Sequence, residues 1–167
     1  MNQEADLQKQ FVAAIKEDEK IIHKVISLYV DHPEDKKDLY QEILLQAWKS
    51  YKNFKGKSKF STWLYRVSLN TVLGFKRKEK PVEELKLQSV EVKESGESKK
   101  ERYEVLYFLI KQLEEVDRMI MTLHLDGYKN QEICEITGMT ANHINVKLHR
   151  LKAKIGEQFK KEINGYS

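Results

Sequence analysis

Residues 127–159 read GYKNQEICEITGMTANHINVKLHRLKAKIGEQF, and this stretch decides the fold of the C-terminal part of the chain. Two segments with helical apolar spacing flank Gly138, whose missing side chain allows the backbone of a tight turn after a helix. Thr140 then offers a hydroxyl that can cap a second helix. The stretch therefore predicts a helix-turn-helix with a first helix of about nine residues.

The second helix of this motif has an apolar face and a basic, polar face. Residues 144, 148, 151, 155 and 159 are apolar and share one side at about 100° per residue. Amide, imidazole and methyl groups between cations suit the DNA major groove, where bases present donors, acceptors and thymine methyls. The alternative for this segment alone is a helical hairpin with a solvated basic face. The candidate DNA-contacting residues are Thr140, Asn142, His143, Asn145, Val146, Lys147, His149 and Arg150.

Composition places the chain among all-α proteins and leaves room for one domain or two small ones. The 167 residues include only two prolines and seven glycines, and no run alternates Val, Ile or Thr with polar residues. A single cysteine excludes an internal disulfide, and no His/Cys cluster has the spacing of a metal site, so we expect neither metal nor cofactor. The charged N-terminus and the absence of long apolar runs predict a cytoplasmic protein without membrane insertion.

The net charge of +4 hides a strong segregation along the chain. Residues 52–80 hold nine basic residues against one acidic residue, and residues 118–167 hold eight against five. Residues 1–51 and 81–117 are net acidic. Two basic blocks separated by acidic ones are typical of two phosphate-contacting surfaces on one chain.

Three helices are predicted before the linker, over about 4–30, 34–52 and 61–79. In the second, the face opposite the apolar residues is polar except for one leucine. The pattern alone favours a solvated face over a docking surface for a protein, because single exposed leucines are common. The residues of this face that would dock are Asp38, Gln41, Glu42 and Leu45.

The loop NFKGKSKF at residues 53–60 places lysines between two phenylalanines. Single-stranded nucleic acid binding uses this combination, since lysines meet phosphates and an unstacked base rests on an aromatic ring. Alternatively both rings fold inward, which we favour for Phe60 because it continues an apolar stripe through Leu64, Val67, Thr71 and Phe75. A second stripe on the same helix mixes tryptophan and asparagine with arginines, which indicates another nucleic-acid contact. Its members are Trp63, Arg66, Asn70 and Arg77.

Residues 81–100 are polar, acidic and serine-containing without helical periodicity, and they predict a flexible linker between domains at 1–80 and 101–167. Helical spacing returns from about residue 101 and supplies a helical pair on which the helix-turn-helix can pack.

Two parts of the chain, about 35–80 and 112–155, resemble in order one family: the extracytoplasmic-function group of bacterial sigma factors, the small alternative promoter-specificity subunits of RNA polymerase. DLYQE at 38–42 with Ala47-Trp48 resembles the region 2 helix that binds the polymerase. FKGKSKFSTWLYRVSLN at 54–70 resembles the segment that melts and reads the minus-ten element. Residues 127–138 with KLHR at 147–150 are similar to the region 4 helix-turn-helix that reads the minus-thirty-five element.

The resemblance implies two small helical domains and a role for each candidate surface. It makes the polar face of the second helix a contact with core RNA polymerase, which reverses the preference from pattern alone. It places Phe54, Lys57, Ser58 and Lys59 in the loop that holds a flipped base, with Arg66 and Asn70 on the promoter-facing helix. Asn145 and Val146 stand where the family often has arginine or serine, so no promoter sequence is carried over. Promoter DNA and core RNA polymerase are the expected partners, and an anti-sigma factor is a further one.

Two other functions compete with this one. A stand-alone, dimeric helix-turn-helix regulator would leave the basic block at 52–80 without a role, and a helical adaptor that binds only protein would have no affinity for DNA. An enzyme is the least supported, because the sequence holds no P-loop, HExxH motif or nucleophile elbow.

Overall fold

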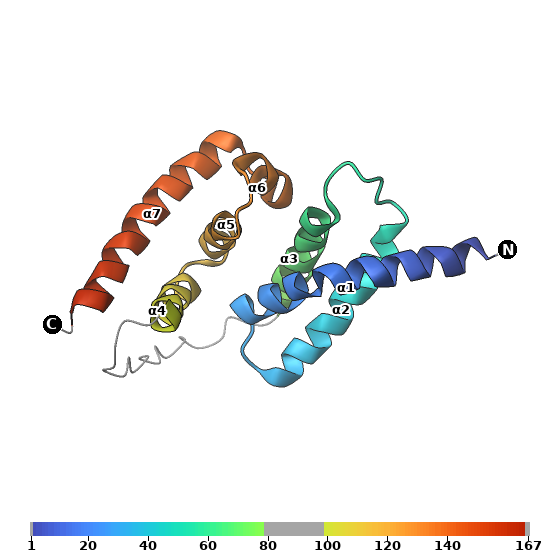
Figure 1. Ribbon diagram of the computed structural model, residues 1–167, viewed down its shortest axis with the longest axis horizontal. Helices are drawn as coiled ribbons and strands as arrows, with labels where there is room; N and C mark the ends of the chain where they lie inside the picture. The colour runs from blue at the N-terminus through green and yellow to red at the C-terminus, as the bar shows by residue number, and fades with distance from the viewer. Residues whose placement is uncertain (1, 79–98, 166–167) are drawn as a thin grey trace. The chain divides into compact units, whose positions relative to one another are not determined.

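The computed structural model describes residues 2–78 and 99–165, and these fall into two compact helical units (Figure 1). Unit 1 contains α1 (Gln3–Tyr29), α2 (Pro33–Tyr51) and α3 (Phe60–Lys78). Unit 2 contains α4 (Lys99–Lys111), α5 (Glu115–Leu125), α6 (Asn130–Thr137) and α7 (Ala141–Asn164). No strand occurs in these two ranges, and the all-α prediction is confirmed. Most of the predicted linker, residues 81–98, lies outside the described residues, while Lys99 and Lys100 already belong to α4.

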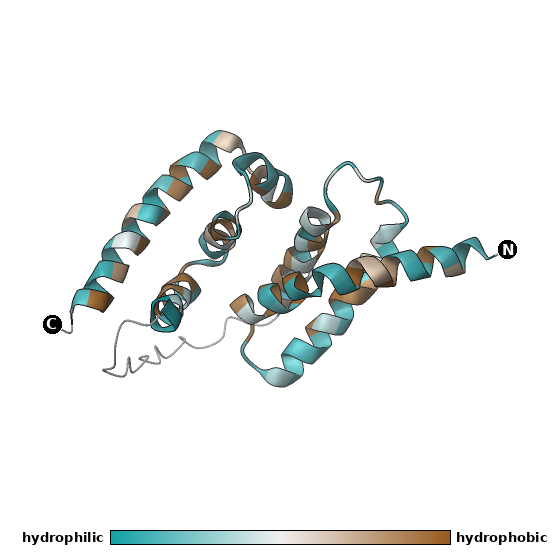
Figure 2. Ribbon diagram, in the orientation of Figure 1, coloured by the Kyte–Doolittle hydropathy of each residue, from teal (hydrophilic) through white to brown (hydrophobic). Residues whose placement is uncertain are grey.

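Unit 1 is a three-helix bundle in which each helix turns its apolar stripe inward (Figure 2). The stripe on α1 centres on Ile22 and Val25, and that on α2 centres on Leu39 and Ile43, all at 2% exposure or less. Pro33 lies in the first turn of α2, where its missing N–H costs no hydrogen bond, and Glu34 and Asp35 follow there. The helical spacing of its apolar residues thus turns one face of α2 towards the core and leaves the opposite face exposed.

The buried face of α3 differs from the predicted one. Tyr65, Leu69 and Val72 are almost fully buried, as is Leu64. Of the predicted stripe through Phe60, only Leu64 is buried. Val67, Thr71 and Phe75 are half-buried because they line an open groove between α2 and α3.

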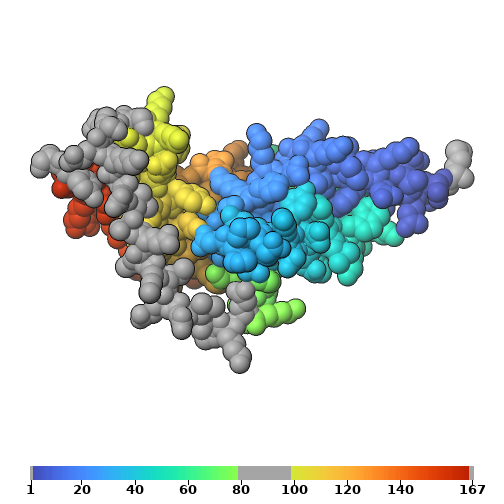
Figure 3. Space-filling view, turned by 90° about the horizontal axis from the view of Figure 1, so that it is seen from below, coloured from blue at the N-terminus to red at the C-terminus, as the bar shows by residue number. Residues whose placement is uncertain are grey.

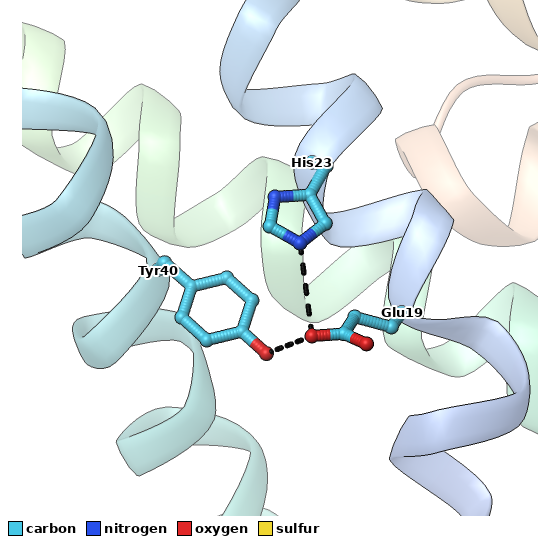
Figure 4. A network of polar contacts seen from close by, with 3 residues as sticks. All are labelled: Glu19, His23 and Tyr40. Atoms are coloured by element: carbon cyan, nitrogen blue, oxygen red, sulfur yellow. Dashed lines mark hydrogen bonds and ion pairs between the residues drawn. The ribbon is translucent and has the colours of Figure 1, made fainter. Parts of the chain in front are cut away.

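A polar network joins α1 to α2 (Figure 4). The Tyr40 hydroxyl donates to Glu19 at 2.6 Å, and the His23 ring stacks on the Tyr40 ring with centroids 5.0 Å apart. The hydrogen bond from Tyr40 lowers the pKa of Glu19, with the charge of His23 adding to the effect. Burial, together with the same hydrogen bond, raises the pKa of Tyr40 to about 12. Figure 3 shows α1 and α2 side by side on one face of unit 1, and the network joins these two helices.

Unit 2 packs α4, α5 and α6 against the long helix α7. Its core includes Ile120, Leu123, Ile133 and Ile144, each fully buried. Arg118 is 8% exposed, and its guanidinium donates to the carbonyl oxygens of Lys111 at 2.6 Å and Leu113 at 2.9 Å. Lys111 is the last residue of α4, whose carbonyl has no helical partner, and Leu113 follows in the connection to α5, so the arginine ties α4 to α5.

Within the described ranges, no helix is both long enough and apolar enough to cross a membrane.

The network in Figure 4 predicts that Tyr40→Phe raises the pKa of Glu19 towards its ordinary value of 4.5. Because the pKa of Glu19 is lower in the folded state than in the unfolded state, the ionised carboxylate stabilises the fold at pH values above 4.5. This stabilisation is lost as the pH falls through the folded-state pKa. Carbon-detected NMR titration of the Glu19 carboxyl measures the change. Tyr107→Phe, on α4, is the matched control and should leave Glu19 unchanged. An unaltered Glu19 titration in Tyr40→Phe would show that the hydrogen bond is absent in solution.

Replacing Arg118 should destabilise unit 2 selectively. Arg118→Met keeps much of the apolar volume but removes two hydrogen bonds to carbonyls, one buried and one part-buried, which should cost about 2–4 kcal/mol. Both tryptophans, Trp48 and Trp63, lie in unit 1, so their fluorescence follows unit 1 while circular dichroism follows all helices. The unfolding of unit 2 is seen by circular dichroism but not by fluorescence. We expect this part of the dichroism transition to move to a lower denaturant concentration. An equal shift in fluorescence would contradict this, and exposed Arg150→Met serves as control.

Candidate nucleic-acid interface

Three aromatic rings cluster beneath the basic loop between α2 and α3. The Phe54 and Trp63 centroids lie 5.2 Å apart, Phe60 and Trp63 5.3 Å apart, and Phe54 and Phe60 5.8 Å apart. All three side chains are half-buried, so the rings support one another and still reach solvent. Tyr51 contacts the cluster and also packs on Phe11 of α1, with those two centroids 5.1 Å apart. The structure thus combines both interpretations of the phenylalanines, because the rings are anchored inward yet remain accessible. We call Phe54, Phe60 and Trp63 the aromatic cluster.

The loop that carries Phe54 of this cluster turns at a glycine and exposes lysines. Gly56 has φ of 70°, in the left-handed region that a side chain disfavours, and so the chain can reverse between the helices. Lys55, Lys57 and Lys59 are exposed around it, and Ser58 is half-buried. Cations beside half-exposed rings are the combination that single-stranded nucleic acid binding uses, for phosphates and unstacked bases respectively.

The predicted nucleic-acid stripe on α3 divides into two parts. Trp63 belongs to the aromatic cluster, whereas Arg66, Asn70 and Arg77 are exposed further along the helix. Asn70 also lines the groove between α2 and α3, of about 660 Å³, together with Asp38 and Glu42 from α2. The structure therefore brings a predicted DNA contact next to two predicted polymerase contacts.

The four predicted polymerase contacts share the outer surface of α2. All are exposed, and Leu45 keeps 46% of its surface. The Glu42 carboxylate accepts a hydrogen bond of 2.8 Å from Gln46 one turn later. Asp38 and Glu42 lean towards α3, while Gln41 lines a second groove shared with α1. The exposed leucine therefore lies between polar groups on both sides.

The helix-turn-helix is formed by α6 and α7 (Figure 1). Gly138 ends α6 with φ of 72°, and the Thr140 hydroxyl accepts a hydrogen bond of 3.3 Å from the backbone N–H of His143. Both sequence predictions for the turn are thus confirmed, and α6 is eight residues long. Of the predicted apolar face, Ile144, Leu148, Leu151 and Ile155 are buried and Phe159 is half-buried.

The predicted DNA face of α7 is exposed, but two of its members hold partners inside unit 2. Asn142, His143, Val146, His149 and Arg150 are exposed, as is the capping Thr140. The Lys147 ammonium instead forms an ion pair of 2.7 Å with Asp117 of α5, and both side chains are largely covered.

Asn145 accepts a hydrogen bond from the side-chain amide of Asn130, the first residue of α6. Sequence reasoning missed both partners, Asp117 and Asn130. Asp117 lies 30 residues from Lys147 along the chain, and Asn130 lies 15 residues from Asn145. No local sequence pattern marks such pairs.

In residues 2–78 and 99–165, no group of three or more His, Cys, Asp or Glu side chains could hold a metal ion.

Comparison with known proteins assigns the family. Residues 15–82 match the sigma-70 region 2 family and residues 103–155 match the sigma-70 region 4 family. The ECF RNA polymerase sigma-E factor of Escherichia coli K12 is 30% identical over 152 residues, covering 80% of this chain and 79% of the relative. The sigma factor SigG of Mycobacterium tuberculosis H37Rv is 56% identical, but over 39 residues, which are 23% of this chain and 10% of SigG.

A solved structure agrees with this fold. The sigma factor RpoE of Bartonella quintana, solved with the anti-sigma factor NepR, superposes with a TM-score of 0.63 at 16% identity, over 93% of this chain and 97% of that one. The chain belongs to the extracytoplasmic-function group of the sigma-70 family of RNA polymerase sigma factors. Proteins of this family direct transcription initiation and are regulatory rather than enzymatic. The stand-alone regulator and the protein-only adaptor are therefore not favoured.

The Asp117–Lys147 pair predicts how salt affects DNA binding by unit 2. A cation that contacts a phosphate of duplex DNA contributes about 0.9 to the slope of log affinity against log salt. Arg150→Ala should flatten the slope by about that amount if Arg150 contacts a phosphate, and Lys147→Ala should flatten it clearly less, because Asp117 already neutralises Lys147. The measurement is titration of a labelled promoter with core polymerase carrying each variant. Equal changes in the two variants would contradict the pairing.

Proposed function

We propose that the two units divide the work of a sigma factor: unit 1 docks on core RNA polymerase and holds the opened minus-ten element, and unit 2 reads the minus-thirty-five element. This gives residues 1–80 and 101–167 separate roles, joined by residues 81–100. The observation that carries the proposal is the aromatic cluster, half-exposed beneath a loop with three exposed lysines. A protein that binds only duplex DNA needs no ring surface for an unstacked base.

Polymerase docking is assigned to the outer surface of α2. Protein interfaces centre on apolar anchors that become fully desolvated, with a polar rim around them. Leu45 is such an anchor, at 46% exposure, and Asp38, Gln41 and Glu42 are polar groups around it. A partner surface with an apolar pocket rimmed by cations fits this arrangement.

Promoter opening is assigned to the loop and α3. Taking a base out of the duplex costs a few kcal/mol, which stacking on an aromatic ring and contacts to the backbone offset. Phe54 and Trp63 supply ring surface, and Lys57 and Lys59 supply charge for the backbone. Ser58 adds a hydroxyl within the same loop, and Arg66, Asn70 and Arg77 continue the contact along α3.

Upstream reading is assigned to α7. Its exposed face offers the amide of Asn142, the imidazoles of His143 and His149, and the methyl groups of Val146, with Arg150 beside them. The proposal places the protein in the cytoplasm, where its polymerase partner works, and includes an anti-sigma factor as a further partner. It assigns no catalytic residue and no cofactor.

Run-off transcription with core polymerase and a panel of bacterial promoters tests this function. The wild type should give promoter-dependent transcripts, and Leu45→Glu should abolish them together with polymerase binding, because it places a charge at the centre of the docking surface. Co-migration with core polymerase in gel filtration measures the binding. Normal polymerase binding by Leu45→Glu would contradict the assignment of α2, and absence of transcripts from the wild type together with no polymerase binding would contradict the function.

The same assay separates melting from docking. The double variant Lys57→Ala/Lys59→Ala should bind polymerase normally but bind a forked promoter more weakly. Two lost single-strand contacts should flatten its salt slope by about 1.4. Lys9→Ala/Lys20→Ala, at exposed positions of α1, is the matched control for charge. An unchanged slope in the loop variant would remove the loop from the mechanism.

A further inference from the structure

The first residue of α6 reaches the helix that faces DNA. The side-chain amide of Asn130 donates a hydrogen bond to the side-chain oxygen of Asn145, in the second turn of α7. Both residues are exposed, so the pair lies at the surface of unit 2 rather than in its core. A surface hydrogen bond between two short polar side chains adds little to stability, and its position suggests another role.

The turn at Gly138 makes this pair possible. With φ of 72°, Gly138 reverses the chain so that Ile133 of α6 and Ile144 of α7 are both fully buried in unit 2. Asn145 follows Ile144 directly and is therefore rotated by about 100° from the core, onto the flank of the DNA face. The side chain of Asn130 closes on it from α6.

The pair fixes one group of Asn145 and leaves the others available. An asparagine carbonyl has two lone pairs and its amide nitrogen has two hydrogens. Asn130 occupies one lone pair, so one acceptor position and both donors of Asn145 remain. Adenine presents a matching pattern in the major groove, with N7 as acceptor and the N6 amino group as donor.

We propose that Asn130 is a positioning residue for specificity: it holds the Asn145 amide in the plane in which Asn145 reads an adenine of the upstream element. The inference rests on the proposed upstream reading by α7 and adds both the base and a residue outside that helix. Immobilising a free side chain on binding costs about 0.5–1.5 kcal/mol, and a side chain already held by Asn130 avoids that cost. Only adenine pairs with both an acceptor and a donor of the held amide, because guanine and thymine offer acceptors alone and cytosine offers a donor alone.

Selection from promoters with a randomised upstream element tests this assignment, using core polymerase carrying the full chain. The wild type should enrich adenine at one position by about 5- to 150-fold, the range expected for a good bidentate contact. Asn145→Ala should abolish that preference, and Asn130→Ala should lower it by about 2- to 12-fold, the factor for immobilising one side chain. Affinity for duplexes without that adenine should stay the same in both variants. The double variant should equal Asn145→Ala.

The controls separate this inference from the function on which it rests. Gln131→Ala changes the next exposed residue of α6 and should leave every preference intact. An Asn130→Ala protein with the wild-type adenine preference overturns the inference, as does a wild type whose preference at the Asn145-dependent position is for another base. In both cases promoter-dependent transcription by the wild type leaves the proposed function standing. A transcribing wild type that enriches no upstream base would overturn upstream reading and the inference together.

Discussion

Ring-to-ring contacts hold the aromatic cluster of unit 1 in place while leaving it half-exposed. A ring left alone in a loop would either collapse inward or move freely, and neither state gives a fixed surface for a base. In this chain Phe54 is held against Phe60 and Trp63, and Tyr51 links the cluster to Phe11 of α1. The long helix α1 thus supports the site although none of its residues was predicted to bind anything. The loop can then be basic and open without losing its shape.

Helical periodicity predicted the secondary structure well because burial imposes it on every helix. The helix bounds and the turn at Gly138 follow directly from apolar spacing, glycine and threonine. The predicted buried face of α3 is wrong, because periodicity shows which residues form an apolar stripe but not how much of that stripe the neighbouring helices cover. Val67 and Phe75 belong to that stripe and yet line a groove, because α2 does not cover them. Tyr65 is buried instead, and tyrosine gives no clear signal either way.

Counting charges along the sequence overstated the free positive charge. Lys147 was counted as part of a cationic flank, but it is paired with Asp117. Lys76, within the basic end of α3, donates to the carbonyl oxygen of Tyr29 at 3.0 Å, at the end of α1, which has no basic residue in its last turn. Each pair joins two helices of one unit, so these cations stabilise the fold, and Lys147 adds little to the surrounding field because Asp117 neutralises it. The separation into basic and acidic blocks remains, with fewer lysines free to meet phosphates.

Family resemblance and structure answer different questions about α7. The resemblance assigns positions to a DNA-reading helix, and the exposed face of that helix agrees with it. What a position reads depends on the orientation of its side chain, which neighbouring elements determine. Asn145 differs from the arginine or serine often found there, and its partner Asn130 comes from α6. An asparagine alone can turn its donors or its acceptor towards a base, whereas one with its oxygen already engaged presents a narrower pattern. The orientation of Asn145 therefore depends on a residue across the turn as well as on α7 itself.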